Sequence, residues 1–96
     1  LLQEQKDLLT RYITSFSDNG LELKMYLNTE IGRLKTKLAE AVNVDAIKND
    51  EEMLNKTNQI VEKLESFAKS DINENVLMTV LKTQSLVEEI YNGDND

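Results

Sequence analysis

Residues 9–41 read LTRYITSFSDNGLELKMYLNTEIGRLKTKLAEA, and this stretch decides the fold class. Apolar or small side chains recur in it at alternating three- and four-residue steps: Leu9, Tyr12, Phe16, Gly20, Leu23, Leu27, Ile31, Leu34, Leu38 and Ala41. The same rhythm returns later in the chain at Met53, Thr57, Ile60, Leu64 and Phe67, and again at Val76, Val80, Val87, Ile90 and Tyr91. Such steps place one side chain per turn on a single helical face, as in helices that pack on other helices. Because the chain contains no proline to break a helix, the sequence predicts an all-α protein.

The composition excludes most catalytic and metal-binding chemistry. The 96 residues include no Cys, His or Trp, so the chain has no disulfide, thiolate, imidazole base, or nitrogen or sulfur ligand for zinc. We therefore expect no enzyme, no metal or cofactor and no small-molecule substrate. No apolar run approaches the roughly 20 residues of a membrane span, and no signal-peptide pattern is present. These features predict no membrane insertion and a cytoplasmic or nuclear location.

The charge is acidic and unevenly distributed. The net charge is −7; residues 1–42 contain six acids and six bases, whereas residues 43–96 contain twelve acids and five bases. An acidic surface repels phosphate backbones. The one basic cluster, Arg33, Lys35 and Lys37, is flanked by Glu30 and Glu40 and is divided between helix faces. We therefore interpret it as a solvated helix face and expect no nucleic-acid partner.

Three places can interrupt the helices: residues 17–20, 43–50 and 70–73, each with polar residues at the spacing of a helix cap. We expect helices over about 2–43, 50–69 and 73–91, packed as an antiparallel bundle or coiled coil in one domain, 1–96. Residue 1 is Leu, and the apolar rhythm is already running there. We therefore expect the chain to be a domain of a longer protein.

The first interruption is the ambiguous one. Phe16 and Leu23 are seven residues apart, so the stripe keeps its phase through residues 17–20. This favours a single helix over 2–43, kinked near Gly20 and roughly 60 Å long, which two helices of about 30 Å cannot cover.

A strip on the long helix would then stay exposed, formed by Leu2, Leu9, Ile13 and Phe16. An exposed apolar strip usually marks an interface, so we expect self-association as a homodimer, or binding of a partner helix. If residues 17–20 form a true turn instead, four helices close into a bundle, and the prediction of self-association or of a partner helix along this segment fails.

The last helix is apolar over most of its circumference, because Leu77, Met78 and Leu81 widen its stripe. A helix of this kind is buried on more than one side, and we favour the interpretation that it is the central helix of the bundle. The alternative is that these three residues form a second face for a partner. Leu21 and Met25, one turn apart and off the main stripe, are interpreted as scattered surface residues.

These features predict a non-enzymatic protein-interaction or oligomerisation module within a larger scaffold. As an alternative, a long helix followed by two shorter ones with acidic caps, and a Leu-rich final helix, resembles a GAT domain of trafficking adaptors over about residues 20–91. Spectrin-like and syntaxin-like bundles have a similar order of helices. The resemblance to a GAT domain implies an adaptor that binds ubiquitin or a small GTPase, with Leu77 to Leu81 at the contact.

Overall fold

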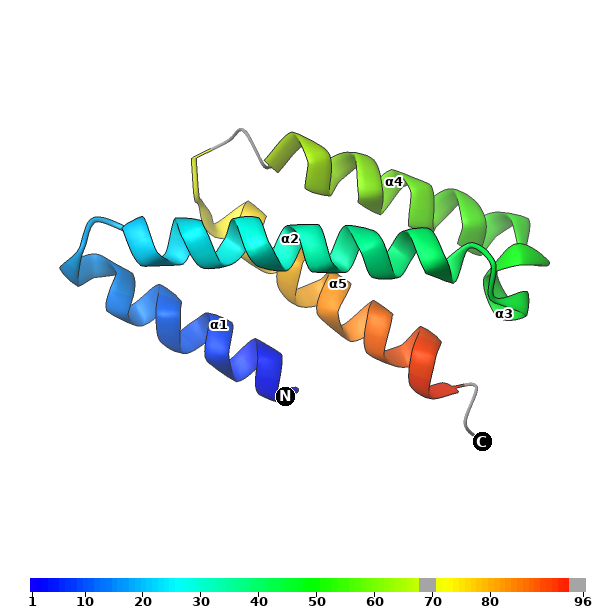
Figure 1. Cartoon of the computed structure of the whole chain (residues 1–96), viewed down its shortest axis with the longest axis horizontal. Coiled ribbons are helices and arrows are strands. Elements are labelled where there is room, and N and C mark those ends of the chain that lie inside the picture. The colour runs from blue at the N-terminus through cyan, green and yellow to red at the C-terminus, as the bar shows by residue number, and fades with distance from the viewer. Residues whose placement is uncertain (68–70, 94–96) are drawn as a thin grey trace.

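The computed structural model describes residues 1–67 and 71–93, which are helical throughout except for short connections and contain no strand. The elements are α1 (Gln3–Thr14), the 3-10 turn η1 (Ser15–Ser17), α2 (Leu21–Ala41), α3 (Asp45–Lys48), α4 (Glu51–Phe67) and α5 (Glu74–Gly93) (Figure 1). The all-α prediction is confirmed. The expected number of three helices is not, because the part of the chain described here has five.

The longest helix, α2, forms the spine of one hydrophobic core. The part of the predicted stripe on this helix is buried: Leu23, Leu27, Ile31, Leu34, Leu38 and Ala41. The last helix, α5, contacts α1, α2 and α4. It is therefore buried on more than one side, as the width of its apolar arc indicated, but α2 also contacts α1, α4 and α5 and is the more central helix.

A turn at Asp18 to Gly20 reverses the chain between α1 and α2, so the expected single helix over 2–43 is wrong. Asn19 and Gly20 have φ angles of 60° and 80°, in the left-handed region that asparagine and glycine tolerate best. Two successive residues there end a right-handed helix. The Asp18 carboxylate accepts hydrogen bonds from the backbone N–H of Gly20 (3.1 Å) and of Glu22 (3.2 Å), and so caps the start of α2.

Phe16 and Leu23 are spaced as if they were on one helical face, but the two side chains do not share a face in the structure. Leu23 is 2 % exposed, whereas Phe16 is 76 % exposed. In α1 the core is reached by Leu8, which is fully buried, and the predicted Leu9 is only half-buried. Because α1 folds back along the bundle, there is no single helix of roughly 60 Å. The argument from helix length for an uncovered strip and a homodimer therefore fails.

The other two interruptions lie where the sequence predicts them. The Asp50 carboxylate accepts a hydrogen bond from the N–H of Met53 (3.2 Å), and the Asn73 side-chain oxygen accepts one from Val76 (3.0 Å), which caps α4 and α5 respectively. Between α2 and α4, the single turn of α3 buries Ile47. The expected helix over 50–69 extends over 51–67 in the described chain, and residues 68–69 lie outside the described residues.

A polar layer, buried at Glu30 and Gln84, joins α1, α2 and α5. Glu30 of α2 is 5 % exposed. Its carboxylate accepts hydrogen bonds from Arg33 Nε (2.6 Å), Arg33 Nη2 (3.0 Å) and Gln84 Nε2 of α5 (2.5 Å). Arg33 Nη2 also donates to Glu4 of α1 (2.7 Å). Burial opposes ionisation of Glu30, but the hydrogen bonds and the charge of Arg33 outweigh it and hold its pKa below the ordinary value.

None of the described helices combines the length and the apolar character that crossing a membrane requires.

Candidate protein-interaction surfaces

The seven residues that the sequence predicts for partner binding have unequal access to solvent. Leu77 is only 5 % exposed and belongs to the core, so it is not available to a partner. Leu2, Leu9 and Leu81 are half-buried. The exposed members of the set are Ile13 (69 %), Phe16 (76 %) and Met78 (50 %).

The side chains of α1 point in three directions. For this reason only some of its apolar residues are buried in the core. Leu8 points into the core. Arg11 faces α2, where its Nη1 donates to Glu22 (2.6 Å) and its guanidinium lies 4.4 Å from the ring centroid of Tyr26. Ile13 lies on neither of these sides and is exposed. The apolar pattern of α1 is therefore broader than the core can cover.

Helices α1 and α5 run antiparallel, and two sets of contacts fix their register. Gln5 Nε2 donates to the backbone oxygen of Leu81 (2.9 Å) and to Ser85 Oγ (2.8 Å). At the other end of α1, Tyr12 and Phe16 line the same cavity as Ile72 and Asn73. The end of α1 therefore lies beside the start of α5, and the start of α1 lies beside the middle of α5.

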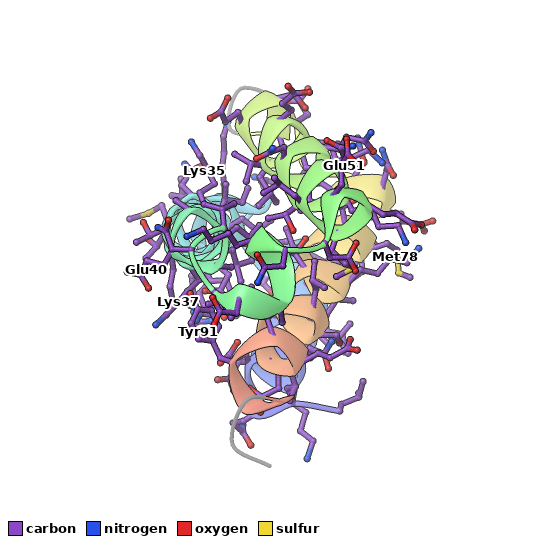
Figure 2. The ribbon with its side chains drawn as sticks, turned by 90° about the vertical axis from the view of Figure 1, so that its right-hand side faces the viewer. Lys35, Lys37, Glu40, Glu51, Met78 and Tyr91 are labelled. Atoms are coloured by element: carbon purple, nitrogen blue, oxygen red, sulfur yellow. The ribbon has the colours of Figure 1, made fainter. Side chains whose placement is uncertain are left out.

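This register brings the two predicted patches to one place. Leu9, one turn after Gln5, is level with Met78, about one turn before Leu81. Figure 2 shows Met78 on the side of α5 that faces away from α2, where Lys37 and Glu40 are labelled. By helical spacing, Leu9 and Ile13 lie on the corresponding side of α1. We call the surface formed by Leu9, Ile13, Phe16 and Met78 the α1–α5 edge.

A cavity of about 480 Å³ adjoins this edge at the turn between α1 and α2. Its apolar lining comes from Tyr12, Phe16, Leu23 and Ile72. The rings of Tyr12 and Phe16 meet edge to face, with centroids 5.6 Å apart. An exposed aromatic side chain beside such a hollow is a suitable anchor for an apolar partner residue.

A second surface, which the sequence reasoning missed, is a groove of about 320 Å³ between α4 and α5. The groove is lined by Met53, Lys56, Gln59, Ile60, Lys63, Lys82 and Leu86. The sequence could have predicted the α4 half of the groove. Lys56 and Lys63 follow the stripe residues Met53 and Ile60 by three positions each, which places them beside the stripe. The α5 half comes from a distant segment, so only the tertiary structure shows that the lysines converge.

Intramolecular contacts occupy the basic cluster of α2. Arg33 pairs with Glu30 and Glu4, Lys35 Nζ lies 3.6 Å from Glu65 of α4, and Lys37 Nζ lies 5.3 Å from the ring centroid of Tyr91. Figure 2 shows Lys35 and Lys37 pointing in different directions from α2. No continuous basic patch for a phosphate backbone results.

The outward face of α2 exposes Leu21 (64 %) and Met25 (65 %), away from the α1–α5 edge. Farther along this helix, a Cβ atom built on Gly32 would meet no atom within 4 Å. No other segment of the described chain therefore approaches the backbone closely at this glycine.

The described residues contain no group of three or more potential metal-ligating side chains. No protein-family model, curated protein or solved structure matches the chain.

Proposed function

We propose that this chain is a non-enzymatic interaction module that associates with a second copy of itself through the α1–α5 edge. Two observations support this proposal: Ile13, Phe16 and Met78 are exposed, and the antiparallel register of α1 and α5 brings the first two level with the start of α5, next to Met78. Scattered single apolar residues are normal on a protein surface, whereas a continuous apolar patch usually marks an interface.

Charges at the two ends of the edge favour a second copy as the partner. Exposed Lys6 lies near the start of α1, and exposed Glu74 lies at the start of α5, level with the end of α1. None of the ion pairs between described residues involves either one. In a two-fold contact each surface meets its own copy in reverse, so Lys6 of one chain would approach Glu74 of the other.

The size of the edge indicates a weak association. The edge is about 18 Å long, the length of the 12 residues of α1, and about 20 Å wide, the width of two helices. A footprint of about 360 Å² per copy is less than half of the roughly 800 Å² per partner in stable complexes. We therefore expect dimers with a Kd of tens to hundreds of micromolar.

Sedimentation equilibrium from about 10 µM to 500 µM tests the proposal, since this range brackets the expected Kd. The wild-type chain should pass from monomer to dimer, and Ile13→Glu should remain monomeric. Met25→Glu is the matched control, because it makes the same change at a residue of similar exposure (65 %) outside the edge. Lys6→Glu should weaken the dimer, and Glu74→Lys in the same chain should restore it. A wild-type monomer over the whole range, or equal effects of the Ile13 and Met25 variants, would overturn the proposal.

The alternative proposal from the sequence is binding of ubiquitin or a small GTPase around Leu77 to Leu81. Within that segment only Met78 is both apolar and exposed, so this proposal has less accessible apolar surface than the α1–α5 edge. Chemical-shift titration with ubiquitin would test it, and unchanged amide signals from Leu77 to Leu81 would remove it.

A further inference from the structure

The groove between α4 and α5 has an apolar floor that the chain itself leaves uncovered. Met53 and Ile60 of α4 and Leu86 of α5 are half-buried, packing on the core beneath while part of each side chain faces the groove. In Figure 1 the two helices run at an angle to each other and diverge toward the right-hand side of the view. The hollow of about 320 Å³ lies between these diverging helices.

The spacing on α4 makes this floor an extended row. Thr57 and Leu64 occupy the fully buried positions of the helix. Met53, Ile60 and Phe67, at seven-residue intervals, form a half-buried row beside them; Met53 and Ile60 line the groove, and Phe67 continues the row beyond its lining. At 1.5 Å per residue the row is about 21 Å long. A row of this length matches about four turns of another helix lying along it.

The rim of the groove has the opposite sign to the chain as a whole. The chain has 18 acidic and 11 basic residues, yet the described lining of the groove contains Lys56, Lys63 and Lys82 and no carboxylate. None of the ion pairs between described residues involves these three lysines. Three ammonium groups around one apolar floor form a local cationic site on an acidic protein.

We propose that the α4–α5 groove binds an acidic amphipathic helix of a partner protein. Aliphatic side chains at positions i, i+4 and i+7 of the partner would lie on Met53, Ile60 and Leu86. Glutamate or aspartate on its flanks would approach the rim lysines, so the charges would determine which helices are accepted. This second surface is formed by other residues than the α1–α5 edge, and its existence does not depend on self-association.

Two designed helical peptides of about 15 residues, roughly four turns, serve as probes. Both have Leu at positions i, i+4 and i+7. One has Glu at every flanking position, and its counterpart has Lys at the same positions. Each is titrated to about 1 mM, so that a Kd of up to about 1 mM is detected, into the ¹⁵N-labelled chain, and amide shifts are recorded. The Glu peptide should produce saturable shifts in residues 53–63 and 82–86, and the Lys peptide should bind at least tenfold more weakly.

Charge-reversal variants test the role of the rim. Lys56→Glu together with Lys63→Glu should weaken binding of the Glu peptide about tenfold, since each reversal contributes a factor of a few at exposed sites. The matched control reverses Lys24 and Lys48, which are also exposed but do not line the groove. Circular dichroism of both double variants checks that the fold is retained.

Several results would overturn the proposal. They are no saturable shift with the Glu peptide, equal binding of the two peptides, shifts confined to residues outside the groove, and equal losses in the two double variants. Binding to phosphatidylserine vesicles without binding to the Glu peptide would also overturn it, because the cationic rim would then serve a membrane surface.

Discussion

Replacing Arg33 by Met should leave a buried carboxylate without its charged partner and reverse the pH dependence of the contribution that Glu30 makes to stability. The side chain of Glu30 is 7 % exposed. It accepts two hydrogen bonds from Arg33 and one from the neutral amide of Gln84. Arg33→Met keeps most of the aliphatic side chain and removes both charged hydrogen bonds. Only the bond from Gln84 would remain.

The magnitude follows from the burial of the two partners. Removing one member of a buried ion pair costs about 3 to 5 kcal/mol. The Arg33 side chain is 38 % exposed, so water partly reaches the site, and we expect the lower limit, about 3 kcal/mol. The lost contact with the half-exposed Glu4 adds no more than about 0.5 kcal/mol. Since small domains are stable by roughly 5 to 15 kcal/mol, the variant should remain folded in water.

The pH dependence gives a sign that a general loss of packing would not produce. In the wild-type chain the pKa of Glu30 is lowered from 4.5, so its contribution to stability is present above about pH 4.5 and is lost as the pH falls through the folded-state pKa. Without Arg33, the burial of Glu30 dominates and raises its pKa. The folded variant then binds the proton more tightly than the unfolded chain, and its stability should increase as the pH falls from 7 toward 4.5.

Urea unfolding followed by circular dichroism between about pH 4 and pH 8 measures both effects. At about 1.5 kcal/mol per molar urea, the expected loss at pH 7 lowers the midpoint by about 2 M. Adding Glu30→Gln to the variant removes the buried charge and should recover part of the loss. A loss below about 1 kcal/mol at pH 7 would refute the reasoning, because the removed partner would then behave as a surface ion pair. A decrease in the variant's stability between pH 7 and pH 5 would refute it as well.

Two further predictions concern α1 and α2, both measured by thermal and urea unfolding. Gly32→Ala should stabilise the protein by about 1 kcal/mol, since the added methyl meets open space in a helix interior. Gly20→Ala should destabilise it by about 1 to 2 kcal/mol, because the φ angle of 80° is strained for alanine; the reverse order would show that α2 does not begin after this turn. Leu8→Ala should cost about 2 to 5 kcal/mol, as expected for a fully buried leucine. Leu9→Ala should cost less than about 1 kcal/mol, since the side chain is half-buried and outside the core cluster; equal losses at the two positions would contradict the assigned face of α1.

The periodicity of the sequence was sufficient to locate the core faces of α2 and α5. These helices are long, and their stripes repeat over four or more turns, so each face is specified many times. The stripe of α4 was located less completely, because only Thr57 and Leu64 are fully buried; Met53, Ile60 and Phe67 are half-buried, and the first two line the groove. The observed capping residues Asp18, Asp50 and Asn73 each lie within a predicted interruption, since the polar side chains that accept backbone N–H bonds are confined to a few residue types.

The candidate surfaces were predicted less well, for a physical reason. Periodicity states which side of a helix is apolar but not which neighbour covers it. Leu77, Met78 and Leu81 all widen the apolar arc of α5, yet Leu77 is buried, Leu81 is half-buried and Met78 is exposed. The groove lysines come from two helices whose spacing no local pattern contains.

The sequence by itself determined that the chain is helical, where the apolar stripe of α2 lies, and that Cys and His chemistry is excluded, because these depend on residue identity and on spacing within one helix. The tertiary structure decided the rest. Two tendencies compete at Asn19 and Gly20. The local phase of the stripe favours a continuous helix, whereas burial of Leu8 in the core requires the chain to reverse, and this burial depends on the whole fold. The Glu30–Arg33–Gln84 layer and the α4–α5 groove likewise exist only where distant segments meet: Glu30 and Gln84 are 54 positions apart, and the groove residues of α4 and α5 are 19 to 33 positions apart.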